Sequence, residues 1–156
     1  MDAATYQPRG LFFEAFDVGL RFVTAGRTIT EADVVSFAGL SGDFNQIHTD
    51  AVFAASGAFG RRVAHGLLVQ SIATGLAVQS GFIDGTVLAF RELDCKFSLP
   101  VFIGDTVHVR IEVTAVKALP RLGGGSVTMQ YHIYNQEGQT VQRGAWVMLV
   151  KSRPAD

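Results

Sequence analysis

The segment Gly66-Leu67-Leu68-Val69-Gln70-Ser71-Ile72-Ala73-Thr74-Gly75-Leu76-Ala77-Val78-Gln79 carries no charge and is apolar or small nearly all round. A helix of this composition must be enclosed by other parts of the protein on most sides. The stretch is too short to cross a bilayer, because a membrane span needs about 18 or more apolar residues. We therefore predict a central helix over residues 66–79, wrapped by a protein sheet.

The sheet is visible downstream of this helix as a period-two pattern. Apolar residues occupy every second position of 107–113 and of 127–133. Such alternation is typical of half-buried antiparallel strands. Further strands are predicted over residues 21–28, 87–97 and 140–150. One enclosed helix and a long curved antiparallel sheet indicate an α+β fold.

Size and composition favour one domain that associates with copies of itself. A chain of 156 residues fits a single domain, taken here as residues 1–156. The hydrophobic fraction is 48% and the mean hydropathy is +0.26, which leaves more apolar surface than one small globule hides. We therefore expect a buried subunit interface, as in a homodimer or a higher homo-oligomer.

Charge and targeting signals exclude several classes of partner. The net charge is −1 and the basic residues are scattered apart from Arg61-Arg62, so nucleic acid is not an expected partner. The first residues show no basic region followed by an apolar stretch, and no membrane span is predicted. The lone cysteine, Cys95, suits a reducing compartment. A cytoplasmic location is the expectation.

Two short helices are predicted ahead of the central one. Thr30 has the properties of an N-cap, and the helix that follows it stops at Gly42. Asp50 is predicted to cap a second helix over residues 51–55. The segment between them, residues 43–48, is therefore placed in the loop that follows the first helix.

That loop carries the first candidate for chemistry, Gly42-Asp43-Phe44-Asn45-Gln46-Ile47-His48. A short bent segment can bring the carboxylate of Asp43 and the imidazole of His48 onto one water. The pair suits general acid/base catalysis, because histidine titrates near neutrality and a neighbouring carboxylate can hold the water. The alternative is structural, with Asp43 in an Asx-turn or capping a helix and His48 partly exposed.

A second element, Val63-Ala64-His65-Gly66, lies at the start of the central helix. Glycine lets a ligand approach the backbone, and the first amides of a helix can stabilise negative charge on a carbonyl oxygen. The alternative is that Gly66 relieves crowding at the helix start while His65 caps or packs.

Two segments resemble the signature of the MaoC-like (R)-specific enoyl-CoA hydratases, and the similarity extends over nearly the whole chain. They are Phe37-Ala38-Gly39-Leu40-Ser41-Gly42-Asp43-Phe44-Asn45-Gln46-Ile47-His48 and Phe59-Gly60-Arg61-Arg62-Val63-Ala64-His65-Gly66. The resemblance implies a hotdog fold, usually dimeric, with the acyl chain beside the central helix and the active site near the subunit interface. It also implies that the substrate is an acyl-CoA, so that coenzyme A is part of the substrate and no separate cofactor is expected.

The resemblance assigns roles to individual residues. Asp43 and His48 match the catalytic pair, Asn45 the motif asparagine, and Gly66 the backbone donor to the thioester oxygen. Thr74 matches a position in the acyl pocket that often carries a small hydroxyl residue. One departure is Gln46, where the family usually has proline, which would fix φ and stiffen the loop.

Two further residues are candidates for substrate binding. His65 adjoins the glycine at the helix start, and Arg62, with Arg61, is the local candidate for contacts to the coenzyme phosphates. The alternative for the arginines is a solvated surface pair. A metal site made from Asp43, His48 and His65 is conceivable by residue type, but it lacks the spacing of ligand pairs, so no metal is expected.

The hypothesis that follows is hydration of a 2-enoyl thioester, or the reverse dehydration, by a water that bridges Asp43 and His48. A hotdog thioesterase is the nearest alternative, although many of these use a carboxylate on or beside the central helix, and residues 67–79 contain none. A non-catalytic acyl-CoA-binding subunit is the other alternative.

Overall fold

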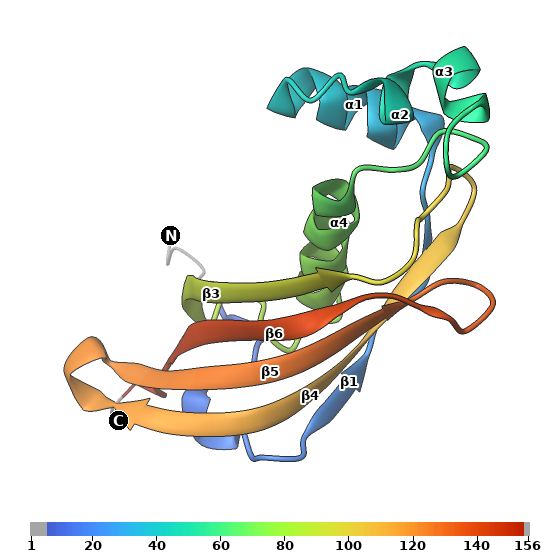
Figure 1. The fold of residues 1–156 in the computed structure, drawn as a ribbon. Coiled ribbons are helices and arrows are strands. Elements are labelled where there is room, and N and C mark those ends of the chain that lie inside the picture. The colour runs from blue at the N-terminus through green and yellow to red at the C-terminus, as the bar shows by residue number, and fades with distance from the viewer. Residues whose placement is uncertain (1–5, 155–156) are drawn as a thin grey trace.

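The computed structural model describes residues 6–154, which form one antiparallel sheet with helices above it (Figure 1). The sheet has the strand order β1-β4-β5-β6-β3, and β2 pairs with the start of β4. The strands are β1 (Arg21–Val23), β2 (Arg27–Thr28), β3 (Val87–Phe97), β4 (Thr106–Leu119), β5 (Gly124–Tyr134) and β6 (Thr140–Lys151).

Helix α4 (Gly66–Gln79) packs against the sheet and forms the core with it. Leu68, Val69 and Ala73 on the helix share a buried cluster with the alternating apolar residues of β4 and β5. Each large apolar side chain that is fully buried contributes about 1.5–3 kcal/mol. The α+β prediction is confirmed, and the central helix has the predicted bounds.

The first strand was expected to run unbroken over residues 21–28, and this prediction is wrong. The structure has β1 and β2 separated at Thr24, whose hydroxyl accepts a hydrogen bond from the backbone N–H of Val109 at 2.9 Å. A side-chain acceptor thus takes part in the ladder at this point. Gly26 follows, where an added Cβ would lie 3.2 Å from Thr106.

Three helices form a layer beyond the N-terminal end of α4, here called the helical cap: α1 (Glu31–Ser41), α2 (Gln46–Thr49) and α3 (Ala51–Ala55) (Figure 1). Thr30 and Asp33 form the capping box at the start of α1, and Asp50 accepts from two amides of α3. The predicted caps of both short helices are confirmed. Since these contacts satisfy amides that a helix start leaves unpaired, they fix where each helix begins.

Helix α4 is less enclosed than its composition predicts. Leu67 and Val78 on its outer side are 58% and 43% exposed. The neighbouring edge strand β3 exposes Phe90, Leu93 and Phe97. These five residues are called the α4–β3 apolar surface.

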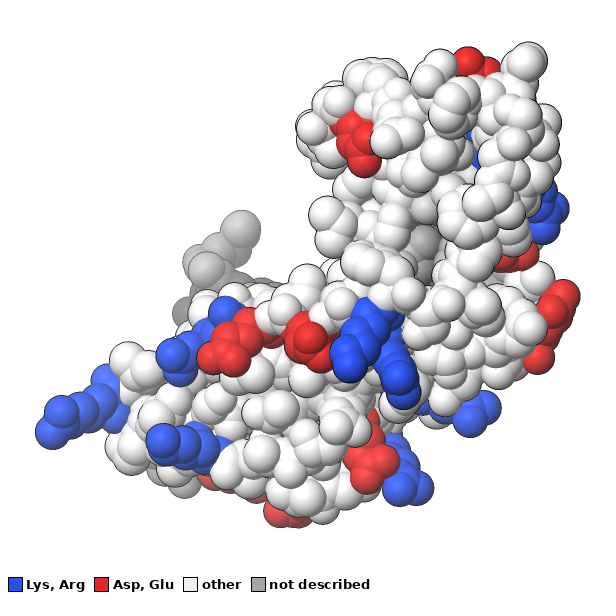
Figure 2. Space-filling view, in the orientation of Figure 1, with Lys and Arg blue, Asp and Glu red and all other residues white. Residues whose placement is uncertain are grey.

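In the orientation of Figure 2 the charged groups lie mostly along the sheet, whereas the cap and α4 are mainly uncharged. Among the described residues, no helix has the length and apolar character that a membrane span requires.

Candidate active site

Asp43 is positioned by the end of α1. Gly42 closes that helix in the left-handed conformation, with φ of 78°, and so turns the chain sharply before Asp43. Ser41 Oγ accepts from the Asp43 amide, and one carboxylate oxygen of Asp43 accepts from the Asn45 amide, both at 3.2 Å. Oδ1 of Asp43 therefore fixes the turn, whereas Oδ2 takes no part in the turn and faces His48.

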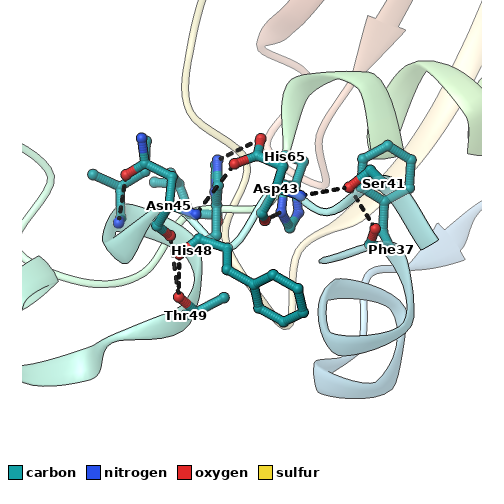
Figure 3. Close-up of polar contacts among 10 residues, drawn as sticks. Phe37, Ser41, Asp43, Asn45, His48, Thr49 and His65 are labelled. Carbon is teal, nitrogen blue, oxygen red and sulfur yellow. Dashed lines mark hydrogen bonds and ion pairs between the residues drawn. The ribbon is translucent and has the colours of Figure 1, made fainter. Parts of the chain in front are cut away.

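His48 lies on a short helix, not in the loop where it was expected. The side-chain oxygen of Asn45 accepts from the Ile47 amide at 3.2 Å and caps α2. This cap starts a helical turn within what the sequence pattern suggested was a continuous loop. Asn45 thus supports His48 through the backbone, and its own side chain is used in the cap (Figure 3).

The geometry of His48 defines its tautomer and its direction. Nδ1 lies 2.7 Å from the carbonyl oxygen of Val63, and because a carbonyl only accepts, Nδ1 carries the hydrogen. The other nitrogen, Nε2, lies 4.0 Å from the free carboxylate oxygen of Asp43. That gap is too long for a direct hydrogen bond, but a single water can bond to both atoms at about 2.8 Å.

Burial differs sharply between the two partners. The side chain of His48 is 10% exposed, and that of Asp43 is 52% exposed. The structural alternative for this segment holds only in part, because Asp43 does form a turn while His48 is buried. A buried base beside a carboxylate open to solvent suits the exchange of a proton with a bound water.

Gly66 faces the same place from the start of α4. It is the first residue of the helix, and no side chain caps that end. A cavity of about 340 Å³ is lined by both Gly66 and His48, together with Val69, Phe97 and Gln142. A Cβ on Gly66 would overlap the ring of Phe97. The glycine therefore permits close packing against Phe97 in the cavity wall, and its N–H is one of the helix-start amides that no side chain caps.

His65 lies behind His48 rather than in the cavity wall. It is 2% exposed, its ring stacks on that of His48 at 3.9 Å between centroids, and its Nε2 lies 2.9 Å from the backbone oxygen of Asp43 (Figure 3). The expectation that His65 binds substrate gains no support from this placement, which instead resembles the packing alternative.

The side chains of the conceivable metal set do come together, since Asp43, His48 and His65 offer ligand atoms within 4.8 Å of one another. Their directions suit a metal poorly. Nε2 of His65 points its hydrogen at the Asp43 carbonyl and so has no lone pair for a metal, and the two imidazole rings stack. The cluster is a carboxylate and an imidazole facing one another, with a second histidine stacked on the first.

Arg62 is occupied by an ion pair. Its guanidinium makes two hydrogen bonds to Glu31, one of 2.9 Å and one of 2.5 Å. These bonds lower the pKa of the Glu31 carboxyl and raise the pKa of Arg62. Arg61 is exposed, with its guanidinium 3.8 Å from the ring centre of Phe102. Of the two arginines, Arg61 is the one free to meet a phosphate.

Gln142 lines the cavity and Thr74 does not, so the predicted place of Thr74 in an acyl pocket gains no support from the structure. Thr74 is half-buried on α4, and its hydroxyl donates to the Ser71 carbonyl at 2.8 Å. Gln142 was missed by the sequence interpretation. It is 2% exposed, lines the cavity and donates to the Gly66 carbonyl at 2.8 Å. A carboxamide within the apolar strand pattern of residues 140–150 was the available signal.

The chain is similar to known proteins in both sequence and fold. The chain is 38% identical over 117 residues to (R)-specific enoyl-CoA hydratase from Aeromonas caviae, which covers 75% of this chain and 83% of that protein. It is 41% identical over 100 residues to protein MaoC from Klebsiella aerogenes, where the match spans 64% of this chain but only 30% of the longer relative.

Solved structures of other proteins have the same fold as this chain. The R-hydratase PhaJ1 from Pseudomonas aeruginosa superposes with a TM-score of 0.77 at 29% identity, over 92% of this chain and 88% of that one. A Mycobacterium tuberculosis protein described as having a double hotdog fold superposes at 0.79 over 95% of this chain and 46% of that one; at 19% identity it supports the fold alone. The hotdog prediction is thereby confirmed. A family model described as a MaoC-like domain matches residues 17–132, and the chain therefore belongs to the MaoC-like dehydratase family.

Proposed function

We propose that this protein adds water to 2-enoyl-CoA thioesters, or removes it from (R)-3-hydroxyacyl-CoA thioesters, with Asp43 and His48 as the acid/base pair. The observation that carries the proposal is the 4.0 Å separation of Asp43 Oδ2 and His48 Nε2 beside the cavity at the start of α4. The relatives named enoyl-CoA hydratase and 3-hydroxybutyryl-CoA dehydratase support the substrate class.

The chemistry follows from the directions of the side chains. A water held between Asp43 and His48 gives up a proton to the pair while its oxygen attacks C3 of the enoyl group. The electrons of the C2–C3 double bond move toward the thioester carbonyl, and a proton from the pair is delivered to C2. The Gly66 N–H and the positive end of α4 stabilise the negative charge that develops on the carbonyl oxygen. The reverse sequence dehydrates the hydroxyacyl thioester.

A spectrophotometric panel of short, long, branched and dicarboxylic 2-enoyl-CoA substrates tests this proposal. The purified chain should consume the enoyl chromophore without releasing free thiol. Asp43→Asn should lower kcat by at least about 100-fold, because a positioned acid/base group supplies ~10²–10⁴ in rate. Asp17→Asn, on an exposed carboxylate away from the cavity, is the matched control and should retain full activity.

The same panel separates the alternatives. Release of free thiol with neither hydration nor dehydration of the acyl chain would indicate a thioesterase. Tight binding of the acyl-CoA with no turnover would indicate a non-catalytic subunit. Normal hydration by Asp43→Asn would rule out the assigned pair while leaving the reaction class standing.

A homodimer formed through the α4–β3 apolar surface is part of the proposal. Strand β3 ends the sheet and pairs with β6 on one side, so its other edge offers unpaired backbone groups beside exposed Phe90 and Leu93. Phe97 belongs to both this surface and the cavity wall, which puts the active site next to the interface. Light scattering should give twice the monomer mass, and Leu93→Glu should reduce it to the monomer.

The coenzyme and the compartment complete the proposal. Arg61, exposed at the edge of a depression of about 210 Å³, is assigned to the coenzyme phosphates in place of Arg62. Acyl-CoA is the substrate, so no further cofactor takes part. A cytoplasmic location is proposed because Cys95 is a free thiol, which suits a reducing compartment.

A further inference from the structure

We propose that His65 is a positioning residue that holds the Asp43 carboxylate and the His48 imidazole at the separation needed for one water. This inference rests on the proposed function, because it concerns the same pair. His65 lies where three parts of the site meet: the loop after α1, helix α2 and the start of α4, for which His65 is itself the N-cap residue.

The first contact is with the backbone of Asp43. Nε2 of His65 lies 2.9 Å from the Asp43 carbonyl oxygen, and since that oxygen only accepts, Nε2 carries the hydrogen. The contact joins residues that are 22 positions apart in the chain. It ties the turn that carries the carboxylate to the residue immediately before Gly66, so the acid/base pair and the helix amide share one anchor.

The second contact is with the ring of His48. The two imidazoles are 3.9 Å apart between centroids, with 27° between their planes. The Phe37 ring, from α1, lies 5.0 Å from His65 at 55°. His48 is thus held from behind by stacking and at Nδ1 by the Val63 carbonyl, and these contacts leave Nε2 directed at Asp43.

The free-energy cost of burying the His65 imidazole argues against a role in packing alone. Its Nδ1 is buried and has no hydrogen-bond partner among the described residues. A buried polar atom without a partner destabilises the fold, and phenylalanine would fill the same space without that cost. Because His65 is 2% exposed and lies outside the cavity wall, it acts on the reaction through Asp43 and His48 and not by touching substrate.

Two substitutions separate the role in positioning from a role in stability. His65→Phe keeps an aromatic ring against His48 but cannot donate to Asp43. His65→Gln keeps an N–H donor of similar reach but loses the ring. We expect His65→Phe to melt at or above the wild-type temperature while its kcat falls about 10- to 100-fold, since a misplacement of about 1 Å can cost 10²-fold.

His65→Gln should regain most of that kcat while melting below His65→Phe, and KM should stay at the wild-type value in both. His132→Phe, a histidine on the outer face of the sheet, is the matched control and should keep wild-type kcat. If His65 only packed, the order of the variants in melting temperature would match their order in kcat.

The proposal is overturned if His65→Phe keeps wild-type kcat, if the loss lies in KM, or if His65→Gln is no more active than His65→Phe. A wild-type protein that hydrates no enoyl thioester refutes the proposed function instead. In that case crystal structures of the wild type and His65→Phe decide the positioning claim: an unchanged separation between Asp43 and His48 refutes it, and a widened one supports it.

Discussion

The sheet and the helical cap are held together by different forces. The inward residues of β4 and β5, such as Val109, Met129 and Ile133, are fully buried against α4. The cap leaves Leu40 85% and Val52 83% exposed, and its helices are fixed by caps, turns and the Arg62–Glu31 ion pair. The core accounts for most of the stability, whereas the proposed acid/base pair comes from the region with little core of its own.

The largest expected effect on stability is in the sheet. Ile133→Ala should lower the free energy of unfolding by about 2–5 kcal/mol, because Ile133 is 0% exposed and the smaller residue leaves a cavity. The melting temperature should fall by roughly 2–4 °C per kcal/mol for a chain of this size. Activity of the folded protein should be unchanged, because Ile133 does not line the cavity. Its cross-strand partner Gln142 does line it, and the Gln142 side chain is held by its own hydrogen bond to the Gly66 carbonyl.

Val116→Ala, on an exposed part of β4, is the control for Ile133→Ala and should change stability by less than about 0.5 kcal/mol. Thermal unfolding and kcat at a temperature well below both transitions give the two readouts. A lower kcat in Ile133→Ala would show that packing within the sheet affects the site, and that the sheet and the cap are coupled.

The next effect lies where the two regions meet, at Gly66. Gly66→Ala should lower kcat by about 10- to 100-fold, because the added Cβ overlaps the Phe97 ring and displaces either that ring or the helix start. The backbone N–H is still present in this variant, so the loss reports on placement and not on a missing donor.

Phe97→Ala removes the atoms that the new Cβ would meet and so supplies the companion variant. We expect Gly66→Ala combined with Phe97→Ala to be more active than Gly66→Ala alone, as measured by kcat. If the double variant is no better, the close approach to Phe97 is not the reason for glycine at this position.

Features that depend on neighbouring residues could be predicted from the sequence, in the sheet and in the cap alike. The bounds of α4, the period-two strands and the caps at Thr30 and Asp50 depend on neighbouring residues, and the sequence pattern identified them correctly. The turn of helix at Gln46–Thr49 is also local, but the Asn45 cap was read as part of a loop.

Contacts between distant segments were not predictable from the pattern. Arg62 and Glu31 are 31 residues apart, and Gln142 and Gly66 are 76 apart. Nothing in the spacing of these residues shows that they meet, because the first distance depends on how α1 lies against the segment before α4, and the second on how α4 lies on the sheet. Asp43 and His48 were identified because a single short segment carries both, whereas the place of His65 beneath them required the fold.

The smallest expected effect concerns Gln46, in the cap. Gln46→Pro should raise the free energy of unfolding by about 0.4–1 kcal/mol, because proline restricts the unfolded chain at a position whose folded backbone suits it. Gln46 is the first residue of α2, where the ring fits and the amide hydrogen is not needed. The preceding residue, Asn45, is outside the α region, with ψ of 135°, which lies in the range that a residue before proline prefers.

The change removes only a long contact of 3.5 Å between the Gln46 carboxamide and Asp50. Gln46→Ala, which loses that contact without fixing φ, is therefore the control, and chemical denaturation of the two variants isolates the contribution of the ring. Equal stability of both variants would show that the α2 backbone is already restricted in the unfolded chain. Higher stability with an unchanged kcat would show that the cap can be made more rigid around His48 without moving it.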